Sequence, residues 1–428
     1  MKSRKILTCM TAMTLFSALA VPIRLAAQSH YSVVELGELG GNSGGANGIN
    51  DRGWVTGTDN LPGNLTTVAT LWVNGTAIPL GTLSGGPNSA VAWPVKSNNG
   101  VIVGISELPD IDPVGENFSC WPFLGEGVPT GRICKGFRWQ NGQMTPLPPF
   151  PGGFSSYATG VNNLGQVVGW AENGVHDPTC NTSFQILQFR AAIWQPDGTM
   201  QELPPLPGDS TSAAVAINDL GQVVGISGDC GVAVGSVSAK HAVLWQNGVP
   251  TDLGNIGGDA WNTPTAINNQ GTIVGFANTV PGTARHYEAF IWTQAGGMKS
   301  LGKLPGDIRS VANGINEKGQ IVGASRGAFP QAVLWENNKL FNLNSLAMSG
   351  SPLLLVAGDI DQQGQIVGEV FDFNTGDTPG FIATPVPPGA AVSSAVRATP
   401  QSLPENVLRQ IERRMGLGIF GIDPITPK

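Results

Sequence analysis

A segment of the form Ile-Asn-x-x-Gly-Gln-Val-Val-Gly recurs seven times along this chain, and this repetition limits the possible folds more than any other feature. Successive copies lie 45 to 65 residues apart. Self-similarity at a period of roughly 50 residues is typical of propellers and solenoids, in which each repeat is one structural unit. The copies end at Gly57, Gly104, Gly169, Gly225, Gly275, Gly323 and Gly368.

Two further motifs divide each unit into four short strands. An apolar segment ending in Trp follows most copies, as in HAVLW (241–245), and a Leu-x-x-Leu segment comes after it, as at Leu203 and Leu206. We therefore expect an Ala-rich strand A, a strand B at Val-Val-Gly, a strand C at the Trp segment and a strand D before Leu-x-x-Leu. The 59 Gly and 32 Pro residues favour many tight turns over long helices.

The two ends of the repeat region complement each other. The seventh unit reaches strand C and then meets Pro385 without a Leu-x-x-Leu segment, whereas YSVVELGEL (31–39) precedes the first unit. An N-terminal strand that completes the last blade leaves no exposed sheet edge. The sequence predicts an all-β fold over residues 31–384, a seven-bladed β-propeller of four-stranded blades whose last blade is closed by the N-terminal strand.

The polar residues of each copy are interpreted as a turn between strands A and B, not as an active site. Glycine supplies the positive φ that a short reversal needs, and an Asn or Asp three residues earlier accepts a backbone N–H. The strand C tryptophans are interpreted as blade core, with a sugar-binding ring as the alternative. The turn residues are Asn50, Gly53, Asn162, Gly165, Asn218, Gly221, Asn268, Gly271, Asn316, Gly319, Asp361 and Gly364.

The segments outside the propeller have distinct compositions. Residues 1–27 form a predicted signal peptide, because a basic start precedes an apolar run and then small residues. Residues 385–402 are a Pro-rich linker, and residues 403–428 are a tail with one short helix. That helix either docks on its own domain or binds a partner. We expect a secreted protein, extracellular or periplasmic.

Charge and motif content exclude several functions. Without residues 1–27 the chain keeps 19 basic and 30 acidic side chains, so nucleic acid is a poor partner. There is no HExxH or Walker motif and the four histidines are scattered, so we expect no cofactor and no metal. We also expect no membrane span in the mature chain. GxSxG occurs around Ser43 and Ser325, but a nucleophile elbow needs a strand, a turn and a helix. We expect a monomer with no catalytic serine.

The loops between strands B and C are unusually long in units two, three and four, at residues 105–135, 170–190 and 226–240. In a propeller these loops and the D-to-A crossings open on one face, where loops most often carry binding residues. The four cysteines outside residues 1–27 all lie there. Four cysteines allow three connectivities, of which we predict Cys120–Cys134 and Cys180–Cys230.

Aromatic and acidic residues that interrupt the repeat are the candidate ligand-binding residues. Aromatic rings bordered by carboxylates suit a glycan or peptide ligand, and the alternative is that the rings form a private core beneath the loops. A polysaccharide hydrolase or lyase that uses loop carboxylates is the competing function. The candidates are Trp93, Trp121, Trp170, Trp261, Asp110 and Asp112.

The repeat pattern resembles that of the bacterial HAF family of extracellular repeat proteins, named for a His-Ala-Phe triplet. The matching segments are His241-Ala242-Val243-Leu244-Trp245, Glu288-Ala289-Phe290-Ile291-Trp292 and Leu36-Gly37-Glu38-Leu39-Gly40-Gly41. The resemblance covers about residues 31–384 and implies a secreted repeat protein. It brings no activity and no catalytic residues. Units two and three depart from the pattern with LPPFPGG and LPPLPGD in place of LGTLGG.

Overall fold

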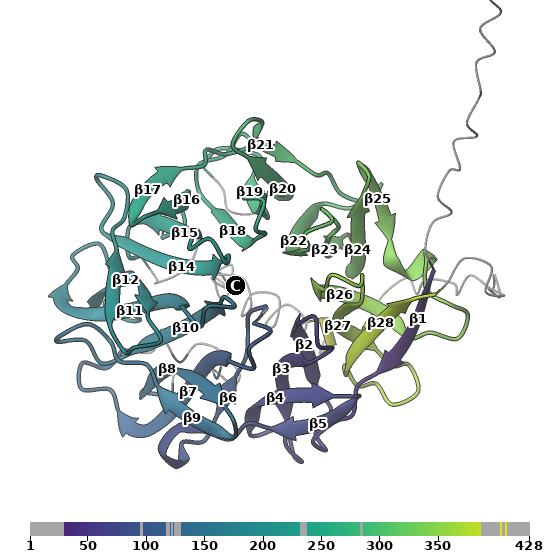
Figure 1. The fold of residues 1–428 in the computed structure, drawn as a ribbon, viewed down its shortest axis with the longest axis horizontal. Coiled ribbons are helices and arrows are strands. Elements are labelled where there is room, and N and C mark those ends of the chain that lie inside the picture. Colours follow the sequence, from purple (N-terminus) through teal and green to yellow (C-terminus); the bar gives the residue numbers. More distant parts are fainter. Residues whose placement is uncertain are drawn as a thin grey trace, which may run out of the picture.

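The computed structural model describes the residues that carry every repeat unit, namely 30–94, 97–116, 120, 123, 130–231, 238–282, 286–386, 403–404 and 407–408. Figure 1 shows seven sheets that follow one another in chain order around a central axis. Each sheet has four antiparallel strands. The predicted all-β, seven-bladed β-propeller is confirmed.

Each blade takes the number of its repeat unit, and its strands run from A near the axis to D at the rim. Blade one has β2 (Gly44–Ile49), β3 (Val55–Asn60), β4 (Thr67–Val73) and β5 (Thr76–Pro79), and blade two has β6 (Ser89–Ala90), β7 (Ile102–Ile111), β8 (Arg132–Gln140) and β9 (Gln143–Pro146). Blade three has β10 (Ser156–Val161), β11 (Val167–His176), β12 (Leu187–Trp194) and β13 (Met200–Leu203), and blade four has β14 (Thr211–Ile217), β15 (Val223–Gly228), β16 (His241–Gln246) and β17 (Val249–Asp252). Blade five has β18 (Asn262–Ile267), β19 (Ile273–Asn278), β20 (Tyr287–Thr293) and β21 (Gly297–Ser300), blade six has β22 (Arg309–Ile315), β23 (Ile321–Arg326), β24 (Pro330–Glu336) and β25 (Lys339–Asn342), and blade seven has β26 (Leu353–Ile360), β27 (Ile366–Phe371), β28 (Gly380–Pro385) and β1 (Tyr31–Glu35). Two 3-10 turns, η1 (Leu83–Gly85) and η4 (Leu343–Ser345), follow the D strands of blades one and six.

The ring closes through the N-terminal strand, as the sequence predicted. Strand β1 pairs antiparallel with β28, with Tyr31 opposite Pro385 and Glu35 opposite Phe381. The pairing continues past β1, because the Leu36 N–H donates to the Gly380 carbonyl at 2.8 Å. Blade seven therefore has the same four strands as the others, although its outermost strand comes from the opposite end of the repeat region.

Strand B approaches strand A so closely at one point in every blade that only glycine fits there. A Cβ atom placed on Gly225 would lie 2.0 Å from the carbonyl oxygen of Ala213, and the matching distance is 1.9 to 2.2 Å at the other six copies. A bulge in strand A, between Ala214 and Ala216 in blade four, brings the backbones together. The last glycine of each sequence copy is thus required by the close approach of the strand A backbone.

The strand C tryptophans fill the space between neighbouring blades. Trp245 is fully buried, and its indole N–H donates to the Pro204 carbonyl of the preceding unit at 2.7 Å. Each such bond satisfies the one polar atom of a large apolar ring, so the ring packs without an unpaired donor. The same bond to the preceding segment recurs from Trp72 to Gly37, from Trp194 to Pro148 and from Trp335 to Leu301.

The predicted tail helix lies mostly outside the described residues. Leu403 and Val407 are buried against the blade six and seven residues Phe329, Leu353 and Phe371. The predicted signal peptide also lies outside the described part of the chain. Within the part that is described, no helix combines the length and the apolar character needed to cross a membrane.

Candidate functional site

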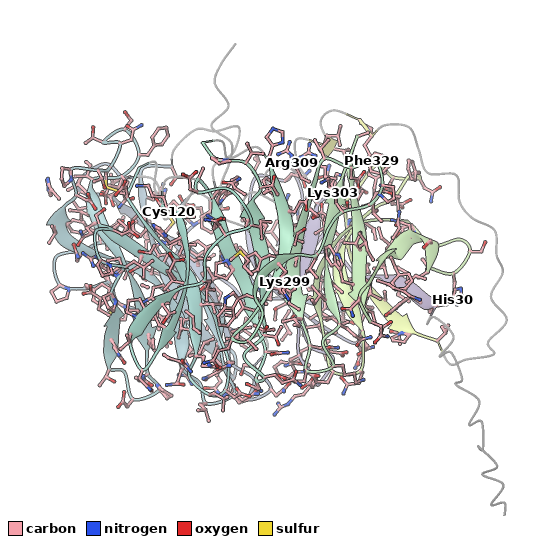
Figure 2. The ribbon with its side chains drawn as sticks, turned by 90° about the horizontal axis from the view of Figure 1, so that it is seen from above. His30, Cys120, Lys299, Lys303, Arg309 and Phe329 are labelled. Carbon is pink, nitrogen blue, oxygen red and sulfur yellow. A yellow bond between two sulfur atoms is a disulfide. The ribbon has the colours of Figure 1, made fainter. Side chains whose placement is uncertain are left out.

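The propeller has two faces with different construction, and Figure 2 shows them from the side. The turn face carries the A-to-B and C-to-D turns, and the insertion face carries the B-to-C loops and the D-to-A crossings. Cys120 and Phe329, which both belong to B-to-C loops, lie toward the upper side of Figure 2, so this side is the insertion face.

The repeated turn of the turn face is held by an Asn side chain in five of the seven copies. In unit four, Asn218 Oδ1 accepts from the backbone N–H groups of Leu220 at 3.1 Å and Gln222 at 3.0 Å. Gly221 has a φ of 73°, a value that glycine adopts without strain. The Asn218 amide also donates to the Asn268 carbonyl of the next unit at 3.0 Å. The polar cluster therefore serves both the turn and the joint between units.

A closed ring of hydrogen bonds runs through all seven turns. The residue after the first turn position of each unit donates its backbone N–H to a side-chain oxygen of the equivalent residue in the next unit. The seventh bond, from the Gln362 N–H to Asp51 Oδ1 at 3.1 Å, returns to unit one. We call these residues the turn ring, and they are Asp51, Asn98, Asn163, Asp219, Asn269, Glu317 and Gln362.

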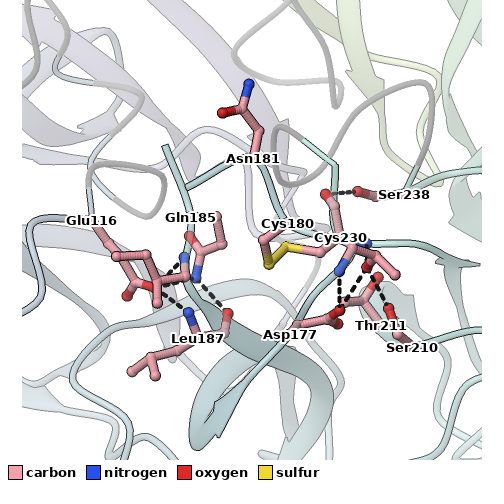
Figure 3. Close-up of a disulfide and its surroundings, with 12 residues drawn as sticks. Glu116, Asp177, Cys180, Asn181, Gln185, Leu187, Ser210, Thr211, Cys230 and Ser238 are labelled. Atoms are coloured by element: carbon pink, nitrogen blue, oxygen red, sulfur yellow. Dashed lines mark hydrogen bonds between the residues drawn. A yellow bond between two sulfur atoms is a disulfide. The ribbon is translucent and has the colours of Figure 1, made fainter. Parts of the chain in front are cut away.

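Both predicted disulfides of the insertion face are confirmed. Cys120 is bonded to Cys134 within the unit two insertion. Cys180 is bonded to Cys230 and joins the loops of units three and four, as Figure 3 shows. Beside this second bond the Asn181 N–H donates to the Gly231 carbonyl at 2.6 Å. The unit two insertion is therefore fixed to its own blade, and the insertions of units three and four are fixed to each other.

A ligand-binding role for Trp170 requires partial exposure, and the structure contradicts it, because the ring is buried in the alternative arrangement, a private core beneath the loops. Trp93, Trp170 and Trp261 are only 3%, 3% and 6% exposed, and Trp121 lies outside the described residues. Trp170 stacks on Tyr157 with ring centroids 4.4 Å apart. The three rings share one apolar cluster with the cysteines of both disulfides, because the long loops fold over the strand ends and need a core of their own.

The candidate acids differ from each other in their surroundings. Asp110 is exposed near the end of β7, whereas Asp112 is buried. Asp112, Glu116 and Glu172 each place one carboxylate oxygen within 4.8 Å of the other two, and all three are 4% exposed or less. Burial, with the neighbouring charge of Glu116, raises the pKa of Glu172 to about 8. Burial also raises the pKa of Glu116, although backbone hydrogen bonds from Leu187 and Ile186 oppose the shift.

Sequence reasoning did not select Glu172. The available signal was a charged residue inside an apolar strand, because Glu172 follows Trp170 and Ala171 in the middle of β11. Nothing in the sequence places Glu172 beside a loop of the preceding unit, so the cluster depends on the tertiary fold.

Exposed apolar side chains stand at the rim of the insertion face. They occupy B-to-C loops or strand ends of units one, two, three, five and seven, and one D-to-A crossing. Six of the large exposed apolar side chains of the described residues lie on this face, whereas Leu164 and Leu220 lie on the turn face. We call these residues the apolar rim, and they are Leu65, Ile111, Val175, Val280, Ile308 and Phe373.

Neither GxSxG serine is available as a nucleophile. Ser325 lies inside β23, is fully buried, and donates to Asp307 Oδ2 at 2.6 Å while it accepts from the Leu304 N–H at 2.9 Å. Ser43 is 2% exposed and precedes β2. Both residues therefore lie in strand structure that lacks the strand-turn-helix arrangement of an elbow.

No family model and no curated protein matches the sequence. Among solved structures, virginiamycin B lyase from Staphylococcus aureus is 12% identical, with 83% of this chain and 100% of that chain covered and a TM-score of 0.46. A streptogramin B lyase is 15% identical over 83% of this chain and 98% of that chain, with a TM-score of 0.45. The β-propeller domain of the Trilobed protease from Pyrococcus furiosus is 8% identical over 87% and 99%, with a TM-score of 0.43. Similarities this remote carry no argument about activity, and the assignment of the fold rests on the sheet topology of this chain.

Proposed function

We propose that this chain is a secreted binding module whose insertion face takes a polypeptide ligand. The observation that carries the proposal is the apolar rim, whose six side chains are 42% to 92% exposed on one face of a closed ring. Rigid scaffolds with ligand-binding loops on one face are a common arrangement. The two disulfides support it further, because loops that are fixed before binding lose less entropy when the ligand arrives.

A polypeptide ligand suits this face better than a glycan. Sugar recognition relies on exposed aromatic rings, and the three described candidate tryptophans are buried. The rim instead presents five aliphatic side chains and one phenyl ring, which match the apolar side chains of a peptide.

Export and family membership are parts of the same proposal. The composition of residues 1–27 supports a cleaved signal peptide, and two disulfides suit an oxidising compartment. The repeat signature supports membership of the HAF family. N-terminal sequencing of protein recovered from periplasm and medium tests export, and we expect a mature chain that begins near Gln28.

The competing hydrolase or lyase finds less support among the described residues. A glycosidase needs two carboxyl groups on either side of the substrate bond. The acids that converge here are buried beneath the loops, and Asp110 is the exposed acid of the predicted pair. A substrate sugar therefore has no access to two acids of this cluster at once.

Parallel screening of the exported protein against a random peptide library and a glycan array tests the proposal. We expect saturable binding to a subset of peptides and no release of sugar products. Release of glycan products that is abolished by Asp110→Asn or Asp112→Asn would establish the enzyme instead. Binding to glycans alone would show that the ligand class is wrong.

A further inference from the structure

Three carboxylates from two repeat units meet beneath the insertion loops. Asp112 and Glu116 belong to the unit two insertion, and Glu172 belongs to β11 of unit three. One oxygen of each lies within 4.8 Å of those of the other two, and the three residues are 2% to 4% exposed. Like charges at this distance repel strongly in a buried setting, so something must compensate them.

Each of these carboxylates is held in place through one of its two oxygens. Asp112 Oδ1 accepts from the backbone N–H groups of Val114 at 2.9 Å and Glu116 at 3.2 Å. Glu116 Oε1 accepts from the backbone N–H groups of Ile186 and Leu187. These bonds orient the carboxylates while the other oxygens, Asp112 Oδ2 and Glu116 Oε2, are buried without a hydrogen-bond partner among the described residues.

Glu172 follows the same pattern. Its Oε2 accepts from the backbone N–H groups of Ser155 at 2.8 Å and Phe154 at 3.2 Å, and its Oε1 lies 3.4 Å from Gln185 Nε2. All three residues therefore keep one oxygen that main-chain donors do not use. A carboxylate with one oxygen fixed and one available is preorganised as a monodentate ligand.

The Gln185 side chain points into the same cluster, as Figure 3 shows beside Glu116. It is fully buried, and its Nε2 lies 3.3 Å from Glu116 Oε1 and 3.4 Å from Glu172 Oε1. Its Oε1 is buried and has no hydrogen-bond partner among the described residues. This neutral side chain also donates its Nε2 to the Leu187 carbonyl at 2.8 Å, and its Oε1 is a further oxygen that no hydrogen-bond donor among the described residues uses.

No basic side chain neutralises the cluster within the described part of the chain. The ion pairs found there join Arg132 to Glu107, Arg190 to Glu202, Lys240 to Asp229, His241 to Asp209 and Asp252, and Lys303 to Glu288. None of them involves Asp112, Glu116 or Glu172. A buried group of acids without a paired base calls for a bound cation or for protons.

We propose that Asp112, Glu116, Glu172 and Gln185 bind a calcium ion that fixes the unit two insertion to blade three. The donors are all oxygens, which select hard cations over zinc or copper. Oxygen ligands about 2.3 to 2.6 Å from Ca²⁺ lie within about 5 Å of each other, as one oxygen each of Asp112, Glu116 and Glu172 do. Mg²⁺ keeps several waters and suits a buried set of protein ligands less well.

Calcium titration of the exported, full-length protein tests the site. After EDTA treatment and dialysis, calorimetry should detect one Ca²⁺ per chain with a Kd of about 0.1 to 1 mM, as in extracellular modules. Saturating Ca²⁺ should raise the melting temperature by about 3 °C, and equal Mg²⁺ should raise it much less. Similar binding of Mg²⁺ would overturn the assignment to calcium.

Charge-removing variants separate coordination from general electrostatics. Glu116→Gln and Glu172→Gln should lower the Ca²⁺ affinity at least tenfold, whereas Asp197→Asn, which removes an exposed acid from the turn face, should leave it unchanged. Elemental analysis of the exported wild type before EDTA treatment gives the answer even if a variant fails to fold. A wild type without stoichiometric calcium and without a Ca²⁺-dependent melting shift would show that protons compensate the cluster and would overturn the proposal.

Discussion

The turn face and the insertion face are made by the same seven units and follow opposite rules. On the turn face every unit repeats one device, so that seven equivalent hydrogen bonds form the turn ring. On the insertion face units two to four differ from each other in loop length, cysteine position and buried acids. Residues that repeat are explained by closing the ring, and residues that depart from the repeat form the face on which we propose that a ligand binds.

Among the repeated residues, we expect the strand B glycines to have the largest effect on the stability of the fold. Gly225→Ala should destabilise the fold by about 4 kcal/mol, because the new methyl group meets the Ala213 carbonyl and strand A cannot move without losing its pairing. Gly221→Ala in the same unit is the matched control. Its Cβ meets nothing within 4 Å, so only the positive φ of 73° opposes it, at about 1 kcal/mol. Urea unfolding measures both values, and equal losses would contradict the close-contact explanation.

The insertion side depends on its disulfides. Replacing Cys180 and Cys230 together by Ser should lower the free energy of unfolding by about 3 kcal/mol, since the bond closes a 50-residue separation. The Cys120 and Cys134 pair spans 14 residues and should contribute about 1 kcal/mol less. Denaturant unfolding of the two double variants tests this order. A larger loss from the shorter loop would show that the insertions are less rigid than their contacts imply.

Two positions on the turn face depart from the rule, Ser97 in unit two and Asp361 in unit seven, and replacing Asp361 should increase stability. Five units have Asn at the first turn position and donate its amide to the next unit, but unit seven has Asp361, whose Oδ2 is buried without a partner among the described residues. Burial raises the pKa of Asp361 to about 6, and the nearby charges of Asp51 and Asp359 add to the shift. Asp361→Asn should stabilise the fold by about 1 kcal/mol at pH 7 through a new bond to the Asn50 carbonyl.

The pH dependence of this gain follows from the direction of the pKa shift. The folded wild type keeps the Asp361 proton up to about pH 6, whereas the unfolded chain releases it near pH 4. This carboxyl therefore stabilises the fold fully below pH 4, and its contribution is lost as the pH rises through 6. The advantage of Asp361→Asn should grow over that interval and stay level above it. Thermal unfolding at several pH values measures it, and an advantage that shrinks with rising pH would reverse the assignment.

The parts of the fold that repetition specifies could be predicted from sequence. Seven glycine positions and a missing strand D were enough for the blade number and for the closure by Tyr31 to Glu35. The disulfides followed from their positions within insertions of known units. In each case the period converts a sequence position into a place in the fold.

The details of the insertion face could not be predicted, because they depend on how unique loops pack. A tryptophan that interrupts the repeat can contact a ligand or pack in a core beneath the loops, and the sequence is the same in both cases. The stacking of Trp170 on Tyr157 shows that it belongs to the core. Glu116 and Glu172 are 56 residues apart, and only the folded loop brings them together. The apolar rim is defined by the exposed fraction of its side chains, and the sequence does not show whether a residue such as Ile111 is exposed or buried.

Binding of a library-selected peptide to matched surface variants tests the central claim most directly. Ile111→Asp and Phe373→Asp change side chains of the insertion face that are 65% and 42% exposed, and Leu164→Asp and Leu220→Asp change side chains of the turn face that are 63% and 70% exposed. None of the four should alter stability by more than about 0.5 kcal/mol. We predict that the two insertion-face variants weaken binding by about tenfold or more and that the two turn-face variants leave it unchanged. Loss of binding in the turn-face variants, with binding retained in the other two, would contradict the account.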